Sequence, residues 1–89
     1  MPRVSEFFGI AIYLYFEDTH RHAAPHFHAR YGEHEAVCSI PDGDPLAGSL
    51  PTRQERLVQG WTALRAEELE RAWARAVNME PPGRIAPLR

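Results

Sequence analysis

The chain has 89 residues, of which 44% are hydrophobic and 25% charged, and its net charge is −2 with neutral histidines. A chain of this size holds one domain with one core, and its slightly acidic balance excludes a strong electrostatic attraction to nucleic acid or to an anionic membrane. The single cysteine, Cys38, excludes an intramolecular disulfide and a zinc site built from several cysteines.

The longest apolar run, FFGIAIYLYF from Phe7 to Phe16, is too short to cross a bilayer. The residues before it lack the charged, apolar and small-residue regions of a signal peptide. We therefore expect a cytoplasmic bacterial protein without membrane attachment.

The same run alternates with period two and predicts one sheltered β-strand. One predicted face consists of Phe8, Ile10, Ile12, Leu14 and Phe16. The other predicted face consists of Gly9, Ala11, Tyr13 and Tyr15. The next stretch, EDTHRHAAP, contains His20 and His22 and predicts a loop.

The stretch from His26 to Ile40 predicts a β-hairpin around Gly32-Glu33, because glycine suits the first central position of a type II′ turn. The predicted register pairs Tyr31 with His34, Arg30 with Glu35, Ala29 with Ala36, His28 with Val37 and Phe27 with Cys38. Directly opposed residues share a face. The apolar face is therefore expected to contain Phe27, Ala29, Tyr31, Ala36 and Cys38. The polar face is expected to contain His26, His28, Arg30, Glu35, Val37 and Ser39, so that both histidines project away from the core.

The turn-forming sequence PDGDPLAG follows, and a short fourth strand is expected around Leu46–Leu50. Thr52 and Glu55 then have the spacing of a capping box. An apolar stripe at helical period predicts a helix from about Arg53 to Val77, either continuous or bent near Ala66, in which Trp61 and Trp73 pack on the sheet.

The predicted fold class is therefore α+β. It consists of an antiparallel β-meander of three to four strands packed against one long C-terminal amphipathic helix, which either stays whole or bends into two. The single domain is expected to span residues 1–78. The proline-rich segment 79–89 is expected to form a flexible tail.

Three stretches, FFGIAIYLYF, PHFHARYGEHEA and LPTRQERLVQGWTALRAEELERAW, resemble in order and spacing a family of small bacterial proteins catalogued as domain of unknown function 4160. The resemblance covers about residues 4–73. It implies a small intracellular domain, and it implies a place beside a second small protein in a regulatory or toxin–antitoxin-type pair. It implies no activity, cofactor or catalytic residue. The loop from Asp18 to Pro25 is longer and richer in histidine than is usual in the family, and Arg65 stands where a histidine is often seen.

A metal site is one hypothesis for the histidines. His26 and His28, two positions apart on a strand, place two imidazoles on one face with a spacing that suits two ligands of one zinc, nickel or copper ion. A third ligand would come from His20, His22 or Asp18, and an open coordination position would permit hydrolysis by a metal-bound water. Glu35 is the candidate partner that would orient a ligand.

A recognition surface is the second hypothesis. If the first predicted strand pairs with the second, Tyr13 and Tyr15 join His26, His28 and Arg30 on the face opposite the helix, with Glu35 beside them. Aromatic rings and a guanidinium on an open sheet face stack on bases or on aromatic side chains. The net charge leaves nucleic-acid binding weak or dependent on a partner, and a protein partner or a homo-oligomer fits better.

A third interpretation treats His26, His28 and His34 as ordinary polar residues of a strand, bonded to Glu35, Ser39, backbone or water. A proton switch is a further hypothesis, because protonation of all five histidines would change the net charge from −2 to about +3. Cys38 is expected to be a buried, inert thiol.

The sequence thus predicts a binding module rather than an enzyme, and it indicates no catalytic residue. The predicted contact surface consists of Tyr13, Tyr15, His26, His28, Arg30 and Glu35. The alternative is a metal-binding protein that uses His20, His22, His26 and His28, with zinc or nickel as the ion.

Overall fold

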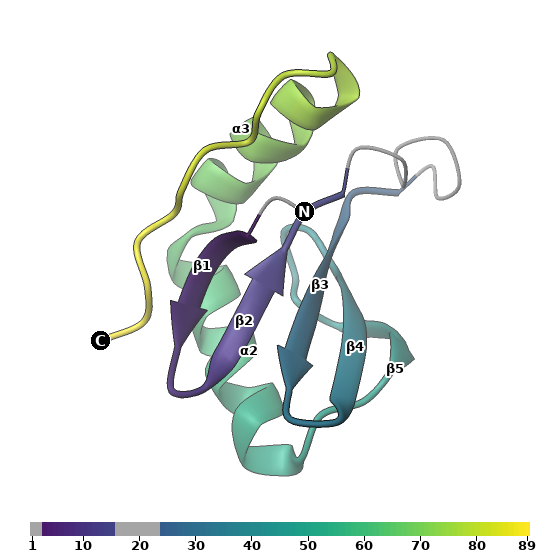
Figure 1. Cartoon of the computed structure of the whole chain (residues 1–89), viewed down its shortest axis with the longest axis vertical. Coiled ribbons are helices and arrows are strands. Elements are labelled where there is room, and N and C mark those ends of the chain that lie inside the picture. The colour runs from purple at the N-terminus through teal and green to yellow at the C-terminus, as the bar shows by residue number, and fades with distance from the viewer. Residues whose placement is uncertain (1–2, 16–23) are drawn as a thin grey trace.

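The computed structural model describes residues 3–15 and 24–89, and it has the predicted α+β class. A five-stranded antiparallel sheet, in the spatial order β1-β2-β3-β4-β5, lies in front of helix α2 in Figure 1, while α3 extends above the sheet in this view. The strands are β1 (Arg3–Phe7), β2 (Ile10–Tyr13), β3 (His26–Tyr31), β4 (His34–Ser39) and β5 (Pro45–Gly48). The helices are α2 (Thr52–Leu64) and α3 (Ala66–Val77). The prediction of three to four strands and one long helix was therefore only approximate.

The predicted first strand is in fact a β-hairpin. Phe8 and Gly9 have φ values of 50° and 79°, so both central residues of the β1–β2 turn are left-handed, as a type I′ turn requires. Phe8 is 59% exposed at this turn, whereas Phe7 pairs with Ile10 and is buried. The prediction that Phe8 shares one strand face with Ile10 and Ile12 was wrong. Alternation alone did not show the turn, because the turn residue Phe8 is itself apolar and lies between Phe7 and Ile10.

The central hairpin of β3 and β4 confirms the predicted register from Phe27–Cys38 to Tyr31–His34, pair by pair. Gly32 has a φ of 59°, the left-handed conformation that a type II′ turn requires at this position. Because alternate residues point to opposite faces, this register places Phe27 and His28 on opposite sides of the sheet.

Strand β5 confirms the predicted fourth strand of the sequence, although it spans Pro45–Gly48 and leaves the buried Leu50 beyond its end. It pairs with β4 at one edge of the sheet. Gly48 has a φ of 68°, and a Cβ at this position would collide with the backbone carbonyl of Glu35. The close approach of the two strands therefore requires glycine.

The helical region breaks at Arg65, whose φ of −114° and ψ of 20° separate α2 from α3. The bend predicted near Ala66 is thus confirmed as a break. The predicted capping box is wrong, because Thr52 is the first helical residue and no described side chain caps the helix. Pro51 occupies the N-cap position, and its carbonyl accepts a hydrogen bond of 2.9 Å from the amide of Glu55.

The core lies between the sheet and α2, and Trp61 is its largest buried side chain. The Trp61 ring lies 5.2 Å from that of Phe7 and 5.8 Å from that of Phe27, measured between centroids. Trp73 is half-buried against the same core, so the predicted packing role of both tryptophans is confirmed. The remaining core is aliphatic, with Val4, Ile10, Ile12, Leu14, Val58 and Leu69 at its centre.

Residues 79–89 form neither helix nor strand, as their prolines indicate. This segment nevertheless lies along the domain, where Figure 1 shows it in yellow running back from the end of α3 beside β1. Ile85 is 5% exposed and belongs to the core. In the described part of the chain, neither helix is long and apolar enough to cross a membrane.

Candidate functional site

Five rings form a continuous row that begins on the sheet face pointing away from α2 and ends at Trp73 of α3. The centroid distances are 6.0 Å from Tyr13 to Tyr15, 4.6 Å from Tyr15 to His28, 5.7 Å from His28 to His26 and 5.0 Å from His26 to Trp73. All four distances lie within the range of favourable ring contacts. We call Tyr13, Tyr15, His28, His26 and Trp73 the aromatic row. Four of its members were predicted to share this face, and the structure brings them together.

His26 is the member whose surroundings differ from the prediction. It lies on the predicted face beside His28, but it is only 1% exposed, so its assignment to an exposed contact surface was wrong. Trp73 of α3 packs against its ring, and its Nδ1 donates a hydrogen bond of 3.0 Å to the carbonyl oxygen of Ala24. The sequence indicated Trp73 only as a core residue, because pairing patterns within the sheet do not show where a distant helix crosses it.

His28 links the aromatic row to charged side chains. Its Nδ1 lies 3.2 Å from Oε2 of Glu35, and because a carboxylate only accepts, Nδ1 carries the proton. Arg30 lies 3.9 Å from the other carboxylate oxygen of Glu35. The side chains of Arg30 and Glu35 are 50% and 48% exposed, whereas that of His28 is 16% exposed. The half-buried imidazole of His28 therefore lies beside two exposed and oppositely charged side chains, Glu35 and Arg30.

Arg3 of β1 extends this edge at the other end and was not predicted. Its guanidinium lies 5.7 Å from the centroid of the Tyr13 ring, and its Nη2 donates a hydrogen bond of 3.4 Å to the Tyr13 hydroxyl. This hydrogen bond raises the pKa of Arg3, with a smaller contribution from the carboxylate of Glu6. This contact was not predicted, because β1 was not recognised as a separate strand.

The predicted metal ligands divide between described and undescribed residues. His26 and His28 lie side by side, while His20 and His22 lie outside the described residues. Within residues 3–15 and 24–89, no three His, Cys, Asp or Glu side chains form a group suited to a metal ion. The remaining histidine, His34, is exposed at the far end of the hairpin.

Cys38 lies on the core face and is 2% exposed, which confirms the predicted buried thiol. Burial raises the pKa of the Cys38 thiol to about 12, with smaller contributions from the carboxylates of Glu55 and Asp44. The thiol is therefore protonated at neutral pH and unsuited to nucleophilic chemistry.

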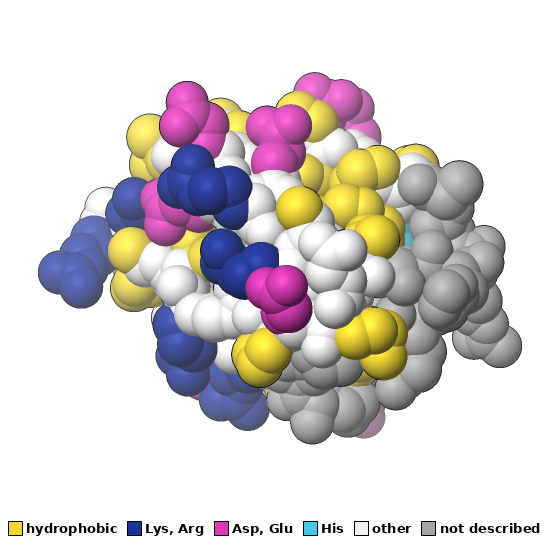
Figure 2. Space-filling model, turned by 90° about the horizontal axis from the view of Figure 1, so that it is seen from above, with side chains coloured by type: hydrophobic (Ala, Val, Ile, Leu, Met, Phe, Trp, Pro, Cys, Tyr) yellow, Lys and Arg dark blue, Asp and Glu magenta, His cyan; other side chains and the backbone are white. Residues whose placement is uncertain are grey.

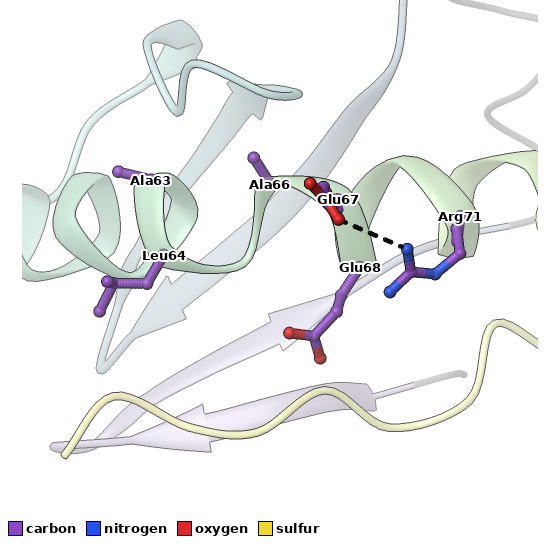
Figure 3. A pocket seen from close by; sticks show the side chains of 6 residues that line it. All are labelled: Ala63, Leu64, Ala66, Glu67, Glu68 and Arg71. Carbon is purple, nitrogen blue, oxygen red and sulfur yellow. Dashed lines mark ion pairs between the residues drawn. The ribbon is translucent and has the colours of Figure 1, made fainter.

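A hollow of about 410 Å³ lies at the junction of α2 and α3 (Figure 3). Glu67 points toward Arg71, with the two charged groups 3.9 Å apart, while Glu68 points to the other side of the helix. No member of the aromatic row lines the hollow, and neither does a histidine or cysteine; its lining residues are Ala63, Leu64, Ala66, Glu67, Glu68 and Arg71. This arrangement is typical of a solvated helix surface.

The charges of the surface are mixed. In the view of Figure 2, arginine and acidic side chains lie next to one another over much of the surface, and hydrophobic side chains gather among them. The net charge of −2 likewise gives the chain no overall excess of basic side chains for phosphate binding.

Comparison with known proteins yields one match. The model of the family described as Domain of unknown function (DUF4160) matches residues 9–74, which include β2 to β5, α2 and most of α3. No curated protein matches the chain. No solved structure matches it either.

Proposed function

We propose that this chain, which belongs to the DUF4160 family of domains of unknown function, is a protein-binding module whose contact surface is centred on the aromatic row. The observation that carries the proposal is the continuous contact of five rings, four from the sheet side opposite α2 and one from α3, four of them only half-buried. Clusters of large aromatic side chains near the surface of a small domain tend to mark interaction sites.

The composition of this surface resembles that of a protein interface. Tyrosine, tryptophan and arginine are the residues that interfaces favour, and a charged rim around an apolar centre is their usual arrangement. Tyr13, Tyr15 and Trp73 provide the apolar area, while Arg3, Arg30 and Glu35 lie at the exposed edge. Glu6 pairs with Arg3 as Glu35 pairs with Arg30, so this edge carries two arginines and two carboxylates and suits a partner with a polar, mixed-charge and aromatic surface.

The support for a particular partner comes from the resemblance of the sequence to the family and not from the structure. It favours a neighbouring small protein in a regulatory or toxin–antitoxin-type pair, with a second copy of this chain as the other protein candidate. The net charge of −2 argues against unaided nucleic-acid binding.

Site-specific photo-cross-linking in cells tests this proposal. A photoreactive residue placed at Arg30, on the edge of the surface, should yield one dominant adduct. The same residue at Glu67, which is 91% exposed on α3 and six positions from Trp73, serves as the matched control and should yield none. Mass spectrometry of the adduct distinguishes a neighbouring gene product from a second copy. Equal adducts from both positions, or none from Arg30, would refute the proposal.

Metal binding is the second candidate function, and a specific observation favours it. Nδ1 of His26 donates to a backbone carbonyl and Nδ1 of His28 donates to a carboxylate, which is how metal-binding histidines are usually oriented. Nε2 would then be the coordinating atom of each ring. Two imidazoles on one tetrahedral zinc have centroids about 5 Å apart, given zinc–nitrogen distances of ~2.0–2.1 Å; the observed separation is 5.7 Å.

Metal analysis of untagged protein, purified without a nickel column, tests the second candidate. About one zinc or nickel ion per chain, lost on replacing both His26 and His28 with alanine, is expected if the site exists. Replacement of His34, which is exposed and distant in the sheet register, is the control and should leave the content unchanged. Substoichiometric metal in the unaltered protein would exclude this candidate.

A further inference from the structure

The C-terminal segment fills a groove between β1 and α2 without forming regular structure. The Ile85 side chain is buried there, and its amide donates a hydrogen bond of 2.7 Å to the carbonyl oxygen of Val4. One residue later, the carbonyl of Ala86 accepts a hydrogen bond of 2.8 Å from the indole Nε1 of Trp61. Leu88 packs partly against the same core.

These contacts have the character of peptide recognition. One backbone amide and one backbone carbonyl of the segment are bound at fixed points, and an aliphatic side chain enters an apolar pocket, as in the addition of an extended peptide to a sheet edge. A buried indole N–H requires an acceptor, so Trp61 favours an occupied groove. The groove is therefore specific for an extended segment with an aliphatic residue at the position of Ile85.

The segment is also separable from the domain that it covers. It lies beyond residues 9–74, which match the family, whereas Trp61 lies within them. It is not a strand of the sheet, and it is joined to α3 by one turn and by a hydrogen bond of 2.7 Å from Nη2 of Arg75 to the carbonyl oxygen of Pro82. Trp61 therefore lies within the residues that match the family, whereas both Val4 and the segment lie outside them.

The connecting turn is strained. The amide of Glu80 donates to Arg75 O and the amide of Met79 donates to Ala76 O, which together form a Schellman motif that reverses the chain after α3. The motif requires a left-handed residue at its turn, where glycine is usual, but this chain has Met79 with a φ of 60°. Opening of the turn would relieve this strain.

We propose that this groove is a second interaction surface, distinct from the aromatic row, and that it accepts the C-terminal segment of a second copy of this chain in exchange for its own. Exchange retains the contacts of Ile85 and Ala86 in each copy and opens the strained turn at Met79, so it costs no contact within the groove. The product is a dimer in which each copy supplies the extended segment of the other.

Binding of the segment in trans is the first test. A labelled peptide with the sequence of residues 80–89 is titrated against the full-length Ile85→Asp chain, in which the charge should release the native segment. Saturable binding is expected, about tenfold or more tighter than to the unaltered chain, whose own segment competes at a high effective concentration. The control is the same peptide carrying I85D, which should not bind.

A failure of the variant to bind the peptide can be distinguished from a failure of the variant to fold. If Ile85→Asp does not fold, as judged by circular dichroism, Ile85→Ala replaces it, because alanine releases the segment without introducing a charge. A folded variant that does not bind the peptide would overturn the proposal. Equal binding of the unaltered and the I85D peptides would also overturn it.

Two substitutions at one exposed residue provide the second test. Met79 is 67% exposed, so its replacement changes the turn and little packing. Met79→Gly should favour the closed monomer, because glycine adopts the left-handed conformation without strain. The dimer association constant should fall by on the order of tenfold for each of the two Met79 turns that the dimer opens. Met79→Val should increase the dimer fraction. Light scattering after size exclusion measures both, and identical association constants for the two variants would refute exchange.

Discussion

The two faces of the β3–β4 hairpin carry alternate residues of the same strands, yet they are built differently. On the face toward α2, Phe27, Ala29, Ala36 and Cys38 are all at most 2% exposed and pack around Trp61. On the opposite face, burial changes along one strand, from 1% exposure at His26 to an exposed Arg30. One face is a core, while the other is a surface covered at one end.

The difference shows how the chain separates stability from recognition. The core face gains its stability from apolar area removed from water, with about 25 cal/mol for each Å². The aromatic row retains polar edges, since each of its histidines donates Nδ1 to a carbonyl or carboxylate. Substitutions on the two faces should therefore have effects of different size and kind.

The largest expected effect is that of Phe27→Ala on the core face. Loss of this fully buried ring and of its contact with Trp61 should lower the free energy of unfolding by about 3–5 kcal/mol. Urea denaturation followed by circular dichroism measures the loss. Phe27→Leu is the milder control and should cost less than about 1.5 kcal/mol. A loss below about 1 kcal/mol for Phe27→Ala would contradict the assignment of this face as the core.

His26→Ala tests the covered end of the opposite face. Because the ring is buried against Trp73 and bonded to Ala24, its removal should cost about 1–3 kcal/mol. His28→Ala, on the same face of the same strand, should cost less, because its bond to Glu35 lies at an exposed edge. Equal losses for the two variants would show that the aromatic row has no buried end.

Cys38 gives the core face a pH dependence that the aromatic row does not share. Its folded-state pKa of about 12 lies above the ordinary value of 9.0, so its contribution to stability is fully present below pH 9. Between pH 9 and 12 the unfolded chain loses this proton first, and stability should fall as pH rises. The fall should be smaller in Cys38→Ala, as measured by urea denaturation at several pH values. Identical pH profiles would contradict the raised pKa.

The sequence predicted the β3–β4 hairpin because local chemistry determined it. Gly32 set the turn, and alternation allowed only one register that separates the apolar from the polar residues. The same alternation failed at Phe8-Gly9, because the turn residue Phe8 is itself apolar and continues the apolar run from Phe7 to Ile10. Periodicity therefore identified strands reliably only where a polar face was present.

Contacts between distant segments were not predictable in this way. Trp73 reaches His26 only because α2 and α3 separate at Arg65, and helical period alone does not give the position of that break. The packing of Ile85 against Val4 joins the two ends of the described chain, and the prolines around Ile85 indicated only a lack of helix. The sequence thus predicted four members of the aromatic row and missed the element that buries one of them.

The smallest expected effect on stability is that of Glu35→Gln at the edge of the aromatic row. This substitution best distinguishes the face that stabilises the fold from the face that binds, because it should weaken binding and leave stability nearly unchanged. Glu35 is 48% exposed, and exposed ion pairs contribute about 0–1 kcal/mol, so the free energy of unfolding should change by less than about 1 kcal/mol. The partner should nevertheless bind less well, because the substitution removes the only carboxylate charge that contacts His28 and Arg30 among the described residues. Adduct formation from position 30 measures this loss, and Glu67→Gln on the outer surface of α3 is the matched control. Unchanged adduct formation, together with unchanged stability, would remove Glu35 from the contact surface and leave the rings as its only specific feature.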